Sequence, residues 1–234
     1  MLQELVLELE KLYSKERAEH SKRFFKTGKG EYSEGDIFIG LSMGEQREIA
    51  KKYTKLSLSN LQKLLNSKVH EYRMVAGLIL TKKFNENPEE VFNFYIKNSK
   101  RFNNWDLVDV TCPRIVGNFL VDKDKKTIYN LAKSKSLWEK RIAIVSTFAF
   151  IKENQFADTL KISEILLDDK QDLIHKAVGW MLREVGKRDV EVLKDFLKIN
   201  YKKLPRTTLR YAIERFPEKE RKKFLKGEFK WTQI

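Results

Sequence analysis

Residues 103–117, NNWDLVDVTCPRIVG, are the stretch around which the rest of the chain is organised. The paired asparagines predict a helix start, because an Asx side chain accepts a hydrogen bond from the free amides of the first turn. Pro113 cannot donate to the carbonyl of Asp109 and its ring presses against it, so we expect the helix to kink there. At about 100° per residue, an apolar stripe that must face a core is formed by Val108, Cys112, Ile115 and Phe119.

Two residues at the edge of this stripe are the first candidates for chemistry. Trp105 and Asp109 are four residues apart, so they are neighbours on one helix face. The large aromatic ring of Trp105 and the carboxylate of Asp109 are therefore expected to lie side by side near the kink at Pro113. On this stretch alone, the simpler alternative is that Trp105 packs in the core and Asp109 is a solvated charge.

Composition indicates a globular protein that binds a polyanion. The chain has 234 residues, of which 41% are hydrophobic and 12% aromatic, and its formal net charge is +14. Such a charge favours nucleic acid, an anionic membrane surface or an acidic protein as partner. No apolar run is long enough to span a bilayer, and the N-terminus lacks the pattern of a signal peptide. The single Cys112 predicts a reducing compartment, and we expect a cytoplasmic protein.

A repeat of about 34–35 residues runs through the chain. The segments starting at residues 71, 139, 175 and 208 look alike, and short polar breaks such as residues 186–189 separate helical stretches. The basic residues of the four segments are Arg73, Arg141, Lys176 and Arg210. The gaps between them are 68, 35 and 34 residues, and the member missing from the long gap falls at Leu107.

This period predicts an all-α solenoid, a superhelix of antiparallel helix pairs that forms a single domain over residues 1–234. One series of its helices lines a concave surface. Trp105 with Asp109, Arg141 and Trp180 fall on equivalent helices of successive repeats, so we expect them to converge on that surface.

Four phrases of the sequence, NNWDLVD, LWEKRIAIVST, HKAVGWMLREVGKRD and RTTLRYAIERF, resemble the AlkD family of DNA alkylation repair glycosylases. The resemblance covers roughly residues 40–216. It implies a HEAT-like solenoid whose basic concave face holds duplex DNA. It also implies hydrolysis of the N-glycosidic bond of cationic N3- and N7-alkylated purines, without the base-flipping pocket common in glycosylases.

The resemblance also assigns roles to residues of this chain. Trp105 and Trp180 match paired aromatics that contact the deoxyribose and backbone at the lesion. Asp109 matches the catalytic carboxylate, and Arg141 matches an arginine at the neighbouring phosphate. No position matches an N-terminal aromatic of the family's site. Residues 26–36, KTGKGEYSEGD, depart from the best-known members, and phosphate contact by this glycine-rich, basic loop is one alternative for it.

The chemistry explains why such residues are needed. An alkylated purine with a formal positive charge leaves without protonation, and an oxocarbenium-like sugar remains. Asp109 would stabilise that cation and orient the attacking water, while the indole faces of Trp105 and Trp180 favour cationic character. Arg141 would hold a phosphate bidentately, although packing or ion pairing is an alternative for it. Trp180 likewise has a core position as its alternative.

The leading hypothesis is therefore a DNA glycosylase that acts as a monomer on double-stranded DNA with alkylated purines. The candidates for contact with the DNA backbone are Arg73, Arg141, Lys176 and Arg210. No cofactor is expected, and His20, His70 and His175 lack companions at the spacing of metal ligands. The alternatives are a non-catalytic binder of distorted or branched DNA and a HEAT-type protein scaffold.

Overall fold

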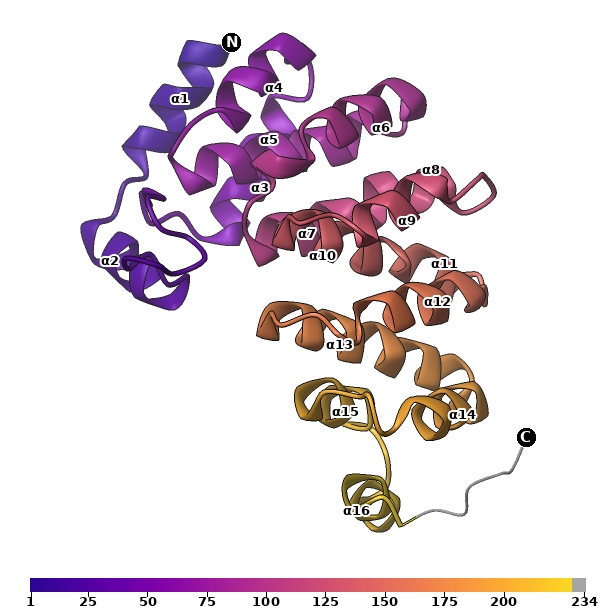
Figure 1. The fold of residues 1–234 in the computed structure, drawn as a ribbon. Coiled ribbons are helices and arrows are strands. Elements are labelled where there is room, and N and C mark those ends of the chain that lie inside the picture. Colours follow the sequence, from indigo (N-terminus) through magenta and orange to yellow (C-terminus); the bar gives the residue numbers. More distant parts are fainter. Residues whose placement is uncertain (229–234) are drawn as a thin grey trace. The chain divides into compact units, whose positions relative to one another are not determined.

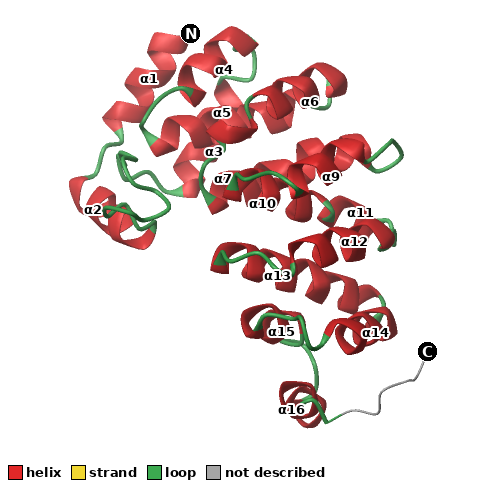
Figure 2. Cartoon of the chain, in the orientation of Figure 1, coloured by secondary structure: helices red, strands yellow, loops and turns green. Residues whose placement is uncertain are grey.

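The structure is a computed structural model that describes residues 1–228, and these residues are built from helices and loops (Figure 1). No strand forms within them, as the colouring by secondary structure shows (Figure 2). An isolated parallel bridge joins Ile37 and Val69. The predicted all-α class is confirmed.

The chain divides into two compact units, Met1–Ile115 and Val116–Ile234. The first contains α1 (Leu2–Lys11), α2 (Lys15–Phe24), α3 (Met43–Lys52), α4 (Leu58–Leu65), α5 (His70–Lys83), α6 (Pro88–Lys97), the 3₁₀ helix η1 (Ser99–Arg101) and α7 (Trp105–Cys112). A π-helical turn, η2 (Pro113–Gly117), spans the division. The second unit contains α8 (Asn118–Leu120), α9 (Lys126–Ala132), α10 (Leu137–Ser146), α11 (Phe148–Lys152), α12 (Ala157–Leu166), α13 (Asp172–Arg188), α14 (Val190–Asn200), α15 (Arg206–Ala212) and α16 (Glu218–Lys226).

Each unit is a stack of helices that matches the predicted repeat. In the first unit α5 packs against α3, α4 and α7, and its residues 74–80 are all buried. In the second unit α13 packs against α10, α12, α14 and α15. The repeated segments form α5, α7, α10, α13 and α15, so successive members of the repeat are neighbours within each unit. This packing is compatible with an α-solenoid, and one repeat domain over residues 1–234 stays a prediction.

Residues 103–117 fold largely as predicted. Asn104 caps α7 in extended conformation, with φ −148° and ψ 156°, and its side chain accepts from the amide of Trp105. Three residues of the apolar stripe, Val108, Cys112 and Ile115, are fully buried. Phe119 is only half-buried, and the ammonium of Lys123 lies 3.6 Å from the centre of its ring.

Pro113 changes the helix type where a kink was expected. It is the C-cap of α7 and the first residue of the π-helical turn η2. A proline lacks the amide that would continue the α-helical hydrogen-bond ladder, and a widened turn is one way in which a chain accommodates that loss.

The predicted break at residues 186–189 is too long, because α13 continues to Arg188 and α14 begins at Val190. Gly186 lies inside α13 rather than in a loop. A Cβ atom at this position would collide with the side chain of Leu193 on α14. The glycine therefore allows two helices to approach each other closely. From the sequence alone, a glycine with this role cannot be told from a glycine that ends a helix.

Gly179 likewise allows two helices, α13 and α15, to approach each other closely. A Cβ atom there would lie 2.5 Å from Tyr211 Cβ and 2.6 Å from the carbonyl oxygen of Thr208. Gly179→Ala should therefore lower the free energy of unfolding by about 1–3 kcal/mol, the usual cost of overpacking. Urea denaturation followed by circular dichroism measures the change.

The matched control is Gly44→Ala in α3, where the nearest atom to an added Cβ is Ser42 Oγ at 3.8 Å. This variant should be unchanged or more stable by up to about 1 kcal/mol, because alanine favours a helix over glycine. A Gly179→Ala protein as stable as the parent would contradict the close packing of α13 on α15.

Candidate functional site

The start of α7 holds the predicted aromatic and carboxylate pair. Trp105 is the first residue of the helix and Asp109 lies one turn later, and both side chains are half-buried. Asn104 is fully buried, and its Nδ2 donates to Ser33 Oγ at 2.7 Å. The cap thus ties the helix to the loop that follows α2. Trp105 and Asp109 therefore lie at the start of a helix whose position is fixed by the Asn104 side chain, which bonds both the Trp105 amide and Ser33.

Trp105 belongs to a cluster of aromatic rings, called here the aromatic cluster, that consists of Phe24, Phe25, Phe38 and Trp105. Phe25 stacks on Trp105 at 5.4 Å between ring centres and on Phe38 at 5.1 Å. Phe24 meets Trp105 edge to face at 5.9 Å. Phe24 is 57% exposed, so the cluster has a core side and a side open to solvent.

A buried charge network lies under the aromatic cluster. The His70 ring stacks on Phe38 at 4.7 Å and packs at 5.1 Å from Phe25. Its Nε2 lies 2.9 Å from Asp106 Oδ2, and its Nδ1 lies 3.8 Å from Asp36 Oδ2. Asp36 also pairs with Arg73 Nη2 at 2.7 Å. The network connects α5, α7 and the loop before α3.

The network favours the charged form of His70. Burial opposes a charge on the ring, but the Asp106 carboxylate, with help from Asp36, outweighs it and raises the pKa of His70 to about 9. His70 is therefore a cation at neutral pH, placed between two carboxylates. It serves both as a stacking partner for Phe25 and as an ionic link between helices.

Residues 26–36 form a loop that is braced internally. The amides of Gly28 and Gly30 donate to the carboxylates of Glu31 and Glu34, each at 2.8 Å. These amides are therefore already occupied and do not form an open nest for a phosphate. The loop instead delivers Ser33 to the cap of α7 and Asp36 to the charge network.

The chain after this loop is fixed by another buried carboxylate. Glu71 is 2% exposed, and it accepts from the amides of Ile39, Gly40 and Leu41. The shortest of these bonds, to Gly40, is 2.8 Å. Glu71 therefore anchors the segment between the aromatic cluster and α3 onto α5.

In the second unit, Arg141 and Trp180 lie on neighbouring helices. Arg141, on α10, is 5% exposed, and its Nη1 donates to the carbonyl oxygen of Leu173 at 2.5 Å. Trp180, on α13, is half-buried, with Nε1 donating to Glu184 Oε1 at 3.2 Å. The Phe148 ring lies 6.1 Å from the Trp180 ring. Trp180 is thus neither a core residue nor fully exposed.

The candidates for backbone contact differ in exposure. Arg210 on α15 is exposed, and Lys176 on α13 is half-buried and paired with Asp172 at 2.7 Å. Arg73 is 3% exposed, pairs with Asp36 and donates to the carbonyl oxygen of Ser67. The guanidinium of Arg73 is therefore committed to the core, and its contact with DNA stays a prediction.

Sequence reasoning missed Phe24 and Phe25, and it also missed the roles of His70, Asp36 and Asp106. The available signal was the Phe-Phe pair at the end of the strongly charged α2, directly before the glycine-rich loop. An aromatic pair next to so polar a helix predicts docking on something outside that helix. Within residues 1–228, no cluster of three or more His, Cys, Asp or Glu side chains is placed to hold a metal ion.

The raised pKa of His70 predicts how stability depends on pH. The folded protein keeps a proton on His70 up to about pH 9, whereas the unfolded chain releases it near 6.5. The stabilisation is complete below about pH 6.5 and is lost as pH rises to about 9, by an amount on the order of 3 kcal/mol. Urea denaturation between pH 6 and 9.5 should show this decline in the parent.

The His70→Gln variant should be less stable at pH 6 and should lose the decline, while His20→Gln, at an exposed histidine of α2, should keep it. If His70→Gln falls in stability with pH as steeply as the parent, His70 does not carry the buried charge.

Comparisons with known proteins agree with this architecture. A family model described as DNA alkylation repair enzyme matches residues 5–216. A solved structure described as a predicted DNA alkylation repair enzyme from Enterococcus faecalis is similar in fold, with a TM-score of 0.72. The two chains are 16% identical, and the match covers 88% of this chain and 97% of that one.

The comparison with curated proteins gave no match. Nowhere in residues 1–228 does a helix have the length and apolar character needed to cross a membrane. The family model accounts for most of the sequence, from a point within α1 to the end of the last repeated segment. The protein therefore belongs to the family of DNA alkylation repair enzymes.

Proposed function

We propose that this protein is a DNA glycosylase that hydrolyses the N-glycosidic bond of cationic N3- and N7-alkylated purines in duplex DNA. One observation carries the proposal. On α7 a carboxylate, Asp109, follows one turn after Trp105, which is part of an aromatic cluster with an open side. A carboxylate has no role in binding phosphates, so its presence beside aromatic rings in a chain of charge +14 favours chemistry on a cation.

The reaction needs little help at the leaving group. When the bond from C1′ to the purine nitrogen breaks, the electron pair stays on the base and neutralises its formal charge. The sugar becomes an oxocarbenium ion, and water then adds to C1′ and releases a proton. The transition state is therefore cationic at the sugar, and the useful catalyst is an anion held close to C1′.

Asp109 would supply this anion and receive the proton of the attacking water. Asp109 lies in a regular helix, four residues after Trp105 and one turn before η2, so its backbone position is fixed before the substrate binds. A charge that is fixed in advance stabilises a transition state without the cost of reorganising solvent.

The aromatic rings would hold the deoxyribose and shield the reaction. The exposed Phe24 and the half-buried Trp105 offer aromatic rings on the first unit, and Trp180 offers an indole on the second. Aromatic faces attract cations, so they favour the charged sugar over the neutral one. Trp105 and Trp180 occupy equivalent helices of the repeat, each within its own unit.

Contacts to the phosphate backbone would come from Arg141, Lys176 and Arg210. Arg210 is exposed and Lys176 is partly so, whereas Arg141 is 5% exposed and one of its N–H groups is bonded to Leu173. Such contacts fix the position of the DNA and make affinity dependent on salt. Double-stranded DNA with alkylated purines is thus the proposed substrate.

The alternative is a non-catalytic binder of damaged or branched DNA that uses the same residues. The two proposals differ at Asp109, since a binder of phosphates gains nothing from a negative charge. Removing the charge would then only strengthen binding.

The variant Asp109→Asn tests this difference. It should bind alkylated duplex at least as tightly as the parent, because a negative charge near the phosphates has been removed. It should release N7-methylguanine about 10²–10³-fold more slowly, the usual cost of losing one preorganised electrostatic contact. Single-turnover base release and a binding isotherm on the same duplex measure the two effects.

The control is Asp122→Asn, which removes the same charge at an exposed position of the second unit and should leave base release unchanged. A protein with Asp109→Asn that releases base within about threefold of the parent would remove Asp109 from the mechanism.

A second pair of variants separates contact with DNA from support of the fold. Arg210→Gln should lower the magnitude of the slope of log affinity against log salt by about 0.9, with the free energy of unfolding unchanged. Arg73→Gln should leave the slope unchanged but destabilise the fold by about 3–5 kcal/mol, because Asp36 would lose its buried partner. If Arg73→Gln lowers the salt slope and Arg210→Gln destabilises the fold, the roles given to both arginines are overturned.

A further inference from the structure

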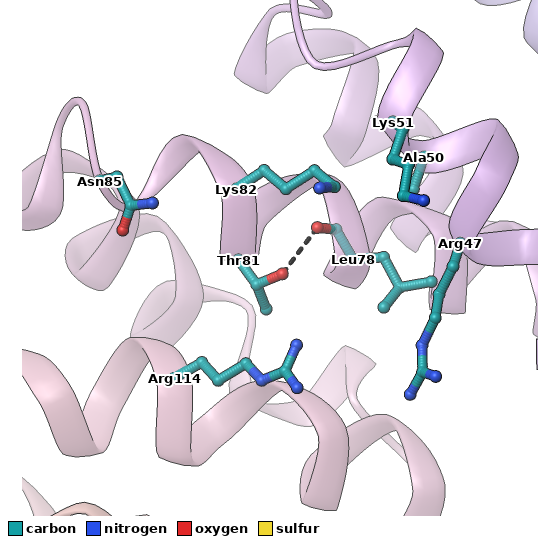
Figure 3. Close-up of a pocket in the computed structure, with 8 residues that line it drawn as sticks. All are labelled: Arg47, Ala50, Lys51, Leu78, Thr81, Lys82, Asn85 and Arg114. Carbon is teal, nitrogen blue, oxygen red and sulfur yellow. Dashed lines mark hydrogen bonds between the residues drawn. The ribbon is translucent and has the colours of Figure 1, made fainter.

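The first unit contains a cavity of about 210 Å³ that lies apart from the aromatic cluster and the charge network. Its walls come from α3, α5 and the turn η2, and its apolar part is formed by Ala50 and Leu78 (Figure 3). The hydroxyl of Thr81 turns inward and donates to the carbonyl oxygen of Leu78 at 2.7 Å. The floor is therefore neutral.

The rim of the cavity is strongly basic. Four cationic side chains line it, Arg47 and Lys51 from α3, Lys82 from α5 and Arg114 from η2, and all four are exposed. Their head groups surround the space in front of Leu78 and Thr81 (Figure 3). Among the described residues, no carboxylate lines the cavity.

A carboxylate nearby offsets only part of this charge. Glu48 pairs with Lys51 at 2.5 Å from outside the lining, and its bond with Lys51 holds the pKa of Glu48 below its usual value. Three of the four cations are left to act on the cavity. Side chains of like charge around one small space repel each other, and apolar walls strengthen their joint field by excluding water.

We propose that this cavity is a binding site for one phosphate group of a DNA strand. Arginine presents a planar fork of donors that fits phosphate oxygens, and Arg47 and Arg114 reach the space from separate elements. Lys51 and Lys82 add point charges. The cavity is smaller than the pockets that enclose whole small molecules, which suits a single anionic group on a larger ligand. The choice of DNA as that ligand rests on the proposed function.

The site would hold a different phosphate from those at the lesion. Arg114 follows Asp109 by five residues, about 8 Å along the helix axis, and Lys82 follows His70 by twelve residues, about 18 Å along α5. Taken as the separation along the duplex axis, at about 3.4 Å per nucleotide on one strand, these lengths correspond to about two to five phosphates. The cavity would thus fix the register of the duplex relative to Asp109.

The experiment measures binding of an undamaged duplex as a function of salt for Arg47→Gln, Arg114→Gln and the double variant. Since both arginines hold one phosphate, the double variant should lower the magnitude of the log–log slope by about 0.9 in total. The control Lys63→Gln, at an exposed lysine of α4 outside the cavity, should leave the slope unchanged. In a separate duplex that carries N7-methylguanine, replacing one phosphate two to five positions from the lesion by methylphosphonate should weaken binding by the parent but not by the double variant.

Other outcomes overturn the proposal. A slope loss of about 1.8 in the double variant would mean two separate contacts, and a slope equal to that of Lys63→Gln would mean none. Inorganic phosphate that shifts the Nε–H resonances of Arg47 and Arg114, with no effect of duplex DNA on them, would assign the cavity to the free anion. Because the duplex is undamaged, a protein that binds as expected but releases no base would contradict only the proposed function.

Discussion

The ion pair between protonated His70 and Asp106 is the interaction on which the geometry of the first unit depends. It joins α5 to α7 at 2.9 Å inside the protein, with Asp36 on the other side of the ring. Because the His70 ring packs on the rings of Phe25 and Phe38, the same residue sets the position of Phe25 and, through it, of Trp105. A charged group is thus used to orient an aromatic surface rather than to act on a ligand.

The loop of residues 26–36 owes its form to this network. A glycine-rich, basic segment suggests contact with phosphate, yet its glycine amides are satisfied by Glu31 and Glu34, and Asp36 is directed inward. The loop is better understood as the connection that brings Phe24 and Phe25 to Trp105. The basic cavity on α3, α5 and η2 has four exposed cations, so in the proposed account support of the site and contact with anions fall to different residues.

The fold was predictable from the sequence because it depends on periodicity, and a repeat near 34 residues repeats the same helix face in α5, α7, α10, α13 and α15. Caps and stripes are local signals as well, and Asn104 and Val108 behaved as expected. The roles of Arg73 and Phe25 were not predictable, because they are decided by partners far away in the sequence. Gly186 shows the same limit, since a glycine at a helix end and one at a helix contact look alike.

The central claim is that the charge of the lesion, rather than a proton donor of the protein, makes the base leave. The most direct measurement compares single-turnover release from one duplex sequence that carries either N7-methylguanine or neutral hypoxanthine at the same position. The account predicts release of the cationic base well above the uncatalysed rate, and no acceleration for the neutral one. Release of both bases at similar rates, or of neither, would contradict it.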